Sequence, residues 1–327
     1  MYKQKAKPFD NFLECLLFVS FWPHLASGPI LRAKNIYDNI NKKEVLNLAT
    51  FTLAIVLICS GLVKKLLIAD NIGAYVNWNF SYGVESMNIF EAWASILGFG
   101  MQIYADFSGY SDMAIGFALL MGFRLPANFN YPYLATSVTE FWHRWHISLS
   151  TWFRDYLYFP LGGSRKGKIK TYINIFIVFL VSGIWHGATI NFAIWGMIHG
   201  LILILEKIFY KSYIRVYKPL RWVITFTLVM IAWAYFRLDV NEANLLVSKM
   251  FDFNKVDFNS TLPYYVAVIV LMLIFPLLEH LFKFYKVDEK GQIILNNKTI
   301  SIVVLAVLLF IAFNFSGSPL PFIYFEF

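Results

Sequence analysis

Apolar runs of close to twenty residues are the feature that most constrains how this chain can fold. A helix needs about 20 mainly apolar residues to cross the hydrocarbon core of a bilayer. By that criterion the sequence predicts membrane spans over residues 12–31, 46–63, 89–105, 108–122, 171–187, 190–207, 220–237, 263–282 and 299–315. The stretch 138–160 is more amphipathic than spanning. We therefore expect an all-α, polytopic membrane protein, with residues 1–327 forming one domain.

The composition supports this class. Hydrophobic residues make up 58% of the chain and charged residues only 15%, whereas a soluble domain has about 45–50% apolar and about 25% charged residues. The net charge of +8 comes from basic residues in short loops between the apolar runs. Such loops orient membrane proteins, so we expect the lipid bilayer as a partner and no nucleic acid.

Two basic loops predict the orientation of a helical hairpin. "SRKGKIK" (residues 164–170) precedes the run 171–187, and a second basic group follows the run 190–207. Because Lys and Arg in short loops stay on the cytoplasmic side, both loops are expected there. His186 is about 16 residues from the first loop, or roughly 24 Å at 1.5 Å per residue. We therefore expect it deep in the protein, toward the outer side.

Two apolar segments contain residues that break or polarise a helix. "FWPHLASGPIL" (residues 21–31) has two prolines and a glycine, and "MQIYADFSGYSDMAIG" (residues 101–116) places Asp106 and Asp112 around Gly109. Irregular backbone at membrane depth is tolerated only where protein buries it or water lines it. Intramembrane carboxylates also mark functional sites. We expect broken or re-entrant helices around a central tunnel.

The stretch "EFWHRWHISLSTWFRDYLYFP" (residues 140–160) concentrates ionisable and aromatic residues. Read as one helix, it spaces Glu140, His143 and His146 so that each neighbouring pair shares a face. A Glu-x-x-His pair is a unit of di-iron bundle sites, so a membrane di-iron enzyme is one alternative. The chain has only six histidines and no second paired box, so we predict no metal. Its aromatics and arginines also suit an interfacial anchor helix.

His146 and His186 offer another interpretation. An imidazole with an ordinary pKa of about 6.5 can take a proton from a hydroxyl and return it to a leaving thiolate. Gly183 and Gly187 bracket His186 and permit close backbone approach beside it. Each histidine taken alone is explained as well by helix packing. The residues by themselves therefore indicate a membrane protein with a histidine-bearing polar cavity.

Four segments occur in a characteristic order: "WPHLASGPILRA", "QIYADFSGYSDMAIG", "GFRLPANFNYPYLATSVTEFWHRWHISLSTWFRDYLYFPLGGSR" and "SGIWHGATINFAIWGMIHG". Together they resemble the membrane-bound O-acyltransferase family, in particular its alginate O-acetylation branch, with D-alanyl transfer proteins of teichoic acid synthesis as neighbours. The resemblance covers residues 8–205. Family members carry further helices before the first segment, so we expect this chain to lack N-terminal helices of the family.

The resemblance implies which residues do the chemistry. The family moves an acyl group from a cytoplasmic thioester to a hydroxyl outside, through a tunnel across the membrane. His186 of "WHG" matches the family's invariant histidine, and His146 of "WHIS" matches the second histidine required in this branch, so both are expected to be catalytic. The expected substrate-binding residues are Trp142, Arg144, Trp185, Asp106, Tyr110 and Asp112.

The resemblance also implies substrates and partners. The donor is expected to be acyl-CoA, in particular acetyl-CoA, or a thioester on a phosphopantetheine arm, with no bound cofactor. Arg144, Arg154 and the basic loop are candidates to meet donor phosphates, with topology and a salt bridge to Asp155 as the alternative. Expected partners are a polysaccharide acceptor, a secreted or membrane-anchored acetyltransferase and an acyl-carrier protein, at a multi-pass location in the inner membrane. D-alanyl transfer to teichoic acid and an inactive truncated scaffold stay open.

Overall fold

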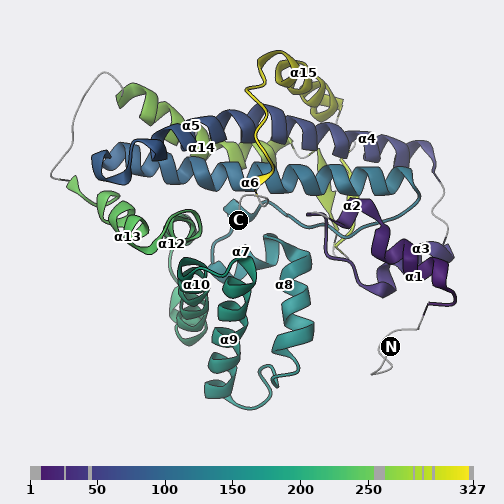
Figure 1. The fold of residues 1–327 in the computed structure, drawn as a ribbon, viewed down its shortest axis with the longest axis horizontal. Helices are drawn as coiled ribbons and strands as arrows, with labels where there is room; N and C mark the ends of the chain where they lie inside the picture. The colour runs from purple at the N-terminus through teal and green to yellow at the C-terminus, as the bar shows by residue number, and fades with distance from the viewer. Residues whose placement is uncertain are drawn as a thin grey trace.

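The computed structural model describes residues 9–25, 27–42, 46–253, 262–282, 284–288, 291–296 and 299–323, and most of them are helical. The predicted all-α class is confirmed. In the described part of the chain, strand is limited to β1 (Tyr285–Val287) and β2 (Ile293–Leu295), which pair antiparallel. Figure 1 shows a layer of long helices above a lobe of shorter ones.

Long helices packed side by side form the upper layer (Figure 1). Its elements are α4 (Leu48–Leu62), the π-helix η1 (Val63–Ala69), α5 (Asp70–Ser81), α6 (Ile89–Leu120), α14 (Leu262–Phe282) and α15 (Thr299–Phe315). The first three run on as one helix, which packs along α6. A π-helical turn inside an α-helix is rare and is frequently found at functional sites.

The lower lobe is built around an antiparallel helical hairpin. Its elements are α7 (Val138–Arg144), α8 (Ile147–Phe153), the π-helix η4 (Arg154–Tyr158), α9 (Lys168–His186), α10 (Ile190–Ile208), α11 (Tyr210–Tyr213), α12 (Lys218–Arg237) and α13 (Val240–Lys249). Gly183 on α9 faces the backbone carbonyl of Phe192 on α10, and Gly196 faces that of Phe179. A side chain at either glycine would separate the two helices.

Shorter elements complete the chain. They are α1 (Phe12–Ser20), α2 (Trp22–Leu25), α3 (Ala33–Lys42) and the 3₁₀ turns η2 (Val84–Ser86) and η3 (Pro132–Leu134). The predicted span over 12–31 is wrong, because α1 ends at Ser20 and the chain is non-helical from residue 27 to residue 32. Pro23, Gly28 and Pro29 explain this, since proline and glycine disfavour a continuous helix.

Four helices in the described residues are long and apolar enough to cross a membrane: Leu48–Ser81, Lys168–His186, Ile190–Ile208 and Lys218–Arg237. The last three confirm the predicted spans 171–187, 190–207 and 220–237. The first begins as predicted for 46–63 but continues through two lysines. Helices also form at 262–282 and 299–315, where the sequence predicted them.

The predicted break near Gly109 is wrong. Residues 89–105 and 108–122 do not form two helices, because α6 runs without interruption for 32 residues. Gly109 instead marks a close helix crossing: a Cβ there would lie 2.9 Å from the backbone oxygen of Gly61 on α4. Here glycine permits contact between helices and does not end one.

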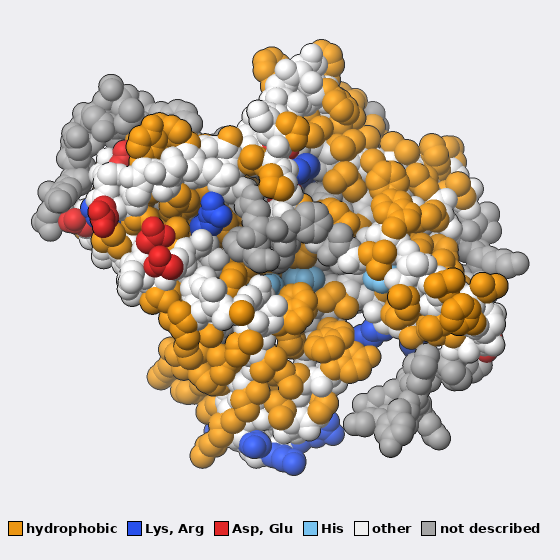
Figure 2. All heavy atoms as spheres, in the orientation of Figure 1, with side chains coloured by type: hydrophobic (Ala, Val, Ile, Leu, Met, Phe, Trp, Pro, Cys, Tyr) orange, Lys and Arg blue, Asp and Glu red, His pale blue; other side chains and the backbone are white. Residues whose placement is uncertain are grey.

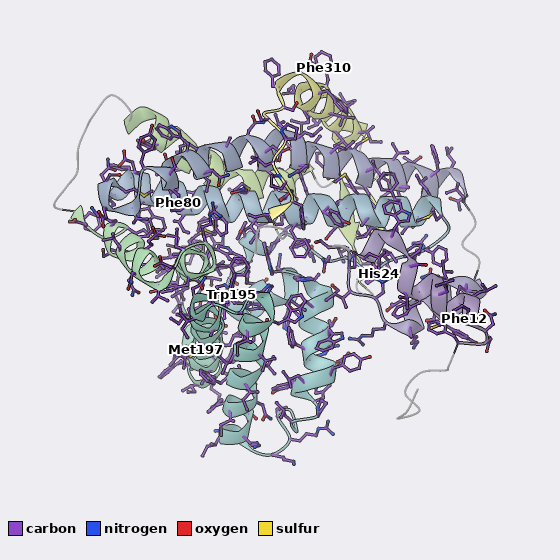
Figure 3. The ribbon with its side chains drawn as sticks, viewed as in Figure 1. Phe12, His24, Phe80, Trp195, Met197 and Phe310 are labelled. Atoms are coloured by element: carbon purple, nitrogen blue, oxygen red, sulfur yellow. The ribbon has the colours of Figure 1, made fainter. Side chains whose placement is uncertain are left out.

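An aromatic core joins the two layers. Trp145, Trp195 and Trp233 are fully buried, together with Tyr104 and Phe99 of α6. Trp145 lies 5.1 Å from Trp233 between ring centroids, and Trp195 stacks on Trp233 at 6.2 Å. Figure 3 shows Trp195 at the end of the lower lobe that lies toward the upper layer. The packing of these large rings against several helices fixes α7, α10 and α12 relative to α6.

Candidate active site

His146 lies at a break between two helices. Helix α7 ends at Arg144, and His146 has φ 41° and ψ 55° as the residue before α8. This is the left-handed region, which costs a non-glycine residue roughly 1–2 kcal/mol and clusters at functional sites. The expectation that Glu140, His143 and His146 lie along one helix is therefore wrong. His143 is exposed, whereas His146 is only 4% exposed.

Polar side chains surround the His146 ring on one side. Its Nδ1 lies 3.0 Å from Oδ1 of Asn128, and the Ser148 hydroxyl donates to the same oxygen at 2.8 Å. The amide nitrogen of Asn128 donates to Ser111 of α6 at 3.1 Å. Phe107 packs edge-on against the imidazole with centroids 4.7 Å apart. The ring is thus held in one orientation.

His186 is the last residue of α9, and Gly187 follows it in an extended conformation. Its ring packs edge-on against Trp195 at 5.2 Å and lies 5.3 Å from Phe236. Its neighbour Trp185 is 58% exposed. Trp185 therefore lies on the outer surface of the helix, while His186 faces the aromatic core.

The two histidines lie in one electrostatic environment. Burial lowers the pKa of His146 well below its ordinary value, and the nearby His186 lowers it further. Burial disfavours the charged imidazolium, so His146 is neutral at neutral pH. A neutral imidazole can accept a proton. Trp145, the residue before His146, packs on Trp233, which stacks on Trp195, the ring that His186 contacts. The fold therefore brings the α7–α8 break and the end of α9 to one aromatic core, although they lie 40 residues apart in the sequence.

The two carboxylates of α6, Asp106 and Asp112, lie in ion pairs. Asp112 pairs with Lys64 at 3.0 Å and accepts a hydrogen bond from the Tyr285 hydroxyl at 2.8 Å. Asp106 pairs with Lys65 at 3.1 Å. Sequence reasoning missed both lysines; two consecutive lysines inside an apolar run were the signal. The carboxylates thus have internal partners before any substrate is considered.

The remaining predicted residues lie in different surroundings. Arg144 pairs with Glu140 one turn earlier at 2.6 Å, and Tyr110 packs against Phe322 with centroids 5.1 Å apart. Arg154 pairs with Asp155 at 2.9 Å, so the expected salt bridge is present. Neither Arg144 nor Tyr110 is among the residues that line the large cavity described next.

A cavity of about 1010 Å³ opens between the α7–α8 segment and the α9–α10 hairpin. Its ionisable lining residues are Glu140, His143, Arg154, Tyr158, Glu206, Lys207, Tyr210, Tyr213 and Arg221. Trp142 also lines it, as do Val178 and Ser182 of α9. His186 follows Ser182 by four residues, so it lies on the same face of the helix. The cavity therefore extends along α9 toward His186.

His199 was missed by sequence reasoning. Trp142 donates its indole N–H to Nδ1 of His199 at 3.2 Å, and both rings pack with Trp195. Since Nδ1 accepts, the neutral ring carries its proton on Nε2, which finds no acceptor in the described part of the chain. Its position four residues after Trp195, on the same face of a helix, was the available signal.

Metal binding was the competing interpretation of this region. Among the described residues, no group of three or more His, Cys, Asp or Glu side chains is placed to hold a metal ion. The break after Arg144 also separates the Glu-x-x-His pair from His146. The site is thus organised around imidazoles and aromatic rings.

These features define a polytopic membrane protein in which a buried histidine and a half-buried one border an aromatic core next to a cavity. The chain belongs to the MBOAT, membrane-bound O-acyltransferase family, whose sequence pattern matches residues 10–238.

Curated relatives agree with this family. A protein of Pseudomonas aeruginosa named "Probable alginate O-acetylase AlgI" is 43% identical over 255 residues, which are 77% of this chain and 48% of that protein. A peptidoglycan O-acetyltransferase of Helicobacter pylori is 40% identical over 246 residues, 73% of this chain and 46% of that protein. A teichoic acid D-alanyltransferase of Bacillus subtilis is 32% identical over 228 residues, 66% of this chain and 57% of that protein. The chain spans about half the length of the alginate and peptidoglycan relatives.

Proposed function

We propose that this chain carries the catalytic histidines of a membrane O-acyltransferase that moves an acetyl group from a thioester to a hydroxyl of an extracytoplasmic polymer or relay protein. The observation that carries the proposal is that His146 and His186 border the same aromatic core, built on Trp145, Trp195 and Trp233, while a cavity follows α9 as far as Ser182. A buried neutral imidazole is suited to general base catalysis.

The reaction needs one proton to be taken and returned. An imidazole takes the proton of the acceptor hydroxyl while the hydroxyl oxygen attacks the thioester carbonyl carbon, forming a C–O bond. The C–S bond then breaks, and the imidazolium returns the proton to the leaving sulfur. No net proton is consumed, so the two histidines end in the state in which they began. Oxygen ester and free thiol are the products.

The cavity is proposed as the donor side of this path. Lys207 and Arg221 lie in its wall, and cations suit the phosphates of a nucleotide or a phosphopantetheine arm. The exposed basic loop that leads into α9 lies at the far end of that helix from His186. Figure 2 shows basic side chains gathered at the free end of the lower lobe. By the positive-inside rule, this end is proposed to face the cytoplasm in a multi-pass inner-membrane protein.

Acetyl is favoured over D-alanyl as the transferred group. The relatives named for O-acetyl transfer are 40–43% identical to this chain, whereas the D-alanyltransferases are 32% identical. The acceptor is proposed to be a hydroxyl-bearing polysaccharide of the envelope, reached directly or through an acetyltransferase partner. Acetyl-CoA and a carrier-borne thioester both fit the donor side. D-alanyl transfer is the second candidate.

The test is mass analysis of envelope polymers from cells with the intact gene, without it, and with His186→Ala. Loss of O-acetyl groups in the deletion and in the variant is expected, with the variant protein still in the membrane fraction. Loss of D-alanine esters would instead support the second candidate. Unchanged acylation in the His186→Ala cells would overturn the catalytic proposal and favour an inactive scaffold.

A further inference from the structure

We propose that Asn128 is a positioning residue that holds neutral His146 with its proton on Nδ1 and its lone pair on Nε2, so that His146 is the base that takes the acceptor's proton. The assignment of the proton rests on hydrogen bonds alone. The assignment of the base rests also on the proposed function.

The orientation of the Asn128 amide follows from a backbone donor. The amide N–H of Ser148 points to Oδ1 of Asn128 at 3.3 Å, and a backbone N–H can only donate. The atom that faces it must therefore be the side-chain oxygen. The other end of the amide then presents its NH₂ group to Ser111, 3.1 Å away, where a hydroxyl oxygen accepts.

A second backbone donor fixes the Ser148 hydroxyl. The N–H of Ile30 donates to Oγ of Ser148 at 2.9 Å, which occupies a lone pair of that oxygen. The hydroxyl hydrogen remains to be donated, and Oδ1 of Asn128 lies 2.8 Å away. The backbone N–H groups of Ser148 and Ile30 thus lead to the same result, which is that Oδ1 of Asn128 accepts hydrogen bonds.

The imidazole must fit this direction. Nδ1 of His146 lies 3.0 Å from the Asn128 oxygen, and two acceptors cannot face each other at that distance without a proton between them. Nδ1 therefore carries the hydrogen. A neutral imidazole has only one N–H, so Nε2 carries a lone pair and is able to accept a proton.

Asn128 is itself held rigidly. Its backbone oxygen accepts from the N–H of Ile147 at 2.9 Å, and the preceding Ala127 donates to Gly291 at 3.0 Å. Asn128 is 1% exposed. Turning its amide over would point NH₂ at two donors in a buried site, which costs about 1–3 kcal/mol for each unsatisfied group. Asn128 thus holds the left-handed turn at His146 through its backbone and sets the tautomer of the His146 ring through its side chain.

Few titratable groups surround His146, so a change in its protonation can be measured separately. Helix α9 presents His186, which is the titratable group coupled to it. Helix α6, the segment around residue 128 and the start of α8 present Phe107, Asn128 and Ser148, which do not titrate in the working range. A carboxylate at position 128 would add a single new charge beside Nδ1.

A test independent of activity uses protein labelled with ¹⁵N-histidine in a bilayer. The signals of His146 are those lost in His146→Gln. At neutral pH the ¹⁵N shifts are expected to show protonated Nδ1 and unprotonated Nε2, and Nε2 protonation would overturn the tautomer. In Asn128→Leu, which removes the acceptor, the fixed tautomer should give way to a mixture. An unchanged spectrum there would show that Asn128 does not set it.

The second test is the pH dependence of acetyl transfer in membranes. Asn128→Asp keeps an acceptor for Nδ1 and adds a negative charge, so the acidic limb of the rate profile should move up by about 1–3 pH units. Asn130→Asp is the matched control, because Asn130 meets Arg144 through its backbone, and its profile should stay in place. If Asn128→Asp is inactive, NMR titration of His146 in that variant supplies the shift. If neither the acidic limb nor the His146 titration moves in Asn128→Asp, the positioning role is overturned. If the wild type and all variants lack acetyl transfer while NMR shows the expected tautomer, only the proposed function is overturned.

Discussion

Lys64 and Asp112 form a buried ion pair at 3.0 Å between two helices made mainly of apolar residues. Lys64 also pairs with Glu279 of α14 at 2.9 Å, and Glu279 accepts from the Tyr104 hydroxyl at 2.6 Å. One ammonium group therefore holds three helices together. Lys64 and Lys65 lie in one π-helical turn. Lys64 pairs with Asp112 and Lys65 with Asp106, two carboxylates nearly two turns apart on α6.

Lys64→Ala is expected to lower the free energy of unfolding by about 3–5 kcal/mol, because it leaves two carboxylates buried without their cation. Thermal unfolding in detergent measures this loss. Lys286→Ala is the control, since Lys286 is an exposed lysine next to Tyr285 of the same network. Equal losses in the two variants would contradict a special role for the buried pair.

Gly183→Ala is expected to destabilise the α9–α10 hairpin by about 1–3 kcal/mol and to reduce acyl transfer, because its Cβ would collide with the Phe192 carbonyl and displace the end of α9. Gly200→Ala on the same hairpin is the matched control. Its nearest atom would be a side-chain carbon at 3.3 Å, so a smaller loss is expected. Unfolding temperature and acyl transfer are measured together, and a milder effect at Gly183 would argue against the close crossing.

His146→Ala is expected to reduce acyl transfer by about 10²–10⁴-fold, the usual contribution of a general base. His143→Ala should reduce transfer much less, because His143 lines the cavity but is exposed and lies before the helix break. O-acetyl release from the polymer is the measurement. An equal loss in both variants would support a site along one continuous helix face.

The stability of the fold should decrease as the pH falls below about 6.5. Burial lowers the pKa of His146 in the folded protein, so between that value and the ordinary one the unfolded chain binds more protons. The free energy of unfolding therefore falls with decreasing pH across this window and is unaffected above it. His146→Gln should flatten the decline, and exposed His143→Gln should not. Unfolding midpoints from pH 5 to 8 decide between these outcomes.

Local patterns allowed the spans of α9, α10 and α12 to be predicted, because uninterrupted apolar runs between basic loops have few alternatives. The same reasoning failed at Gly109, where glycine permits a helix crossing, a property of the partner helix and not of the local sequence. It failed again after Arg144, where nothing in "RWHIS" shows that His146 adopts a left-handed conformation. The groups that contact this turn come from Asn128, 18 residues earlier, whose side chain meets the His146 ring and whose carbonyl accepts from Ile147.

The candidate site shows the same division. His146 and His186 were found from the residues around them and from the family resemblance. Asn128, Lys64 and His199 were not, because their roles depend on partners brought near only by the fold. Trp185 and Arg144 illustrate the converse. They stand beside motif histidines in the sequence, but one is exposed on the helix surface and the other pairs with Glu140.

The buried network also sets an order for biogenesis. Asp112 follows Lys64 by 48 residues, so this pair can form as soon as α6 has been synthesised. Glu279 follows Tyr104 by 175 residues and reaches its partners only after the whole α9–α10 hairpin has been synthesised. Until Glu279 has been synthesised, Lys64 and Tyr104 lack this carboxylate partner. The buried network is therefore complete only when α14 has packed against η1 and α6.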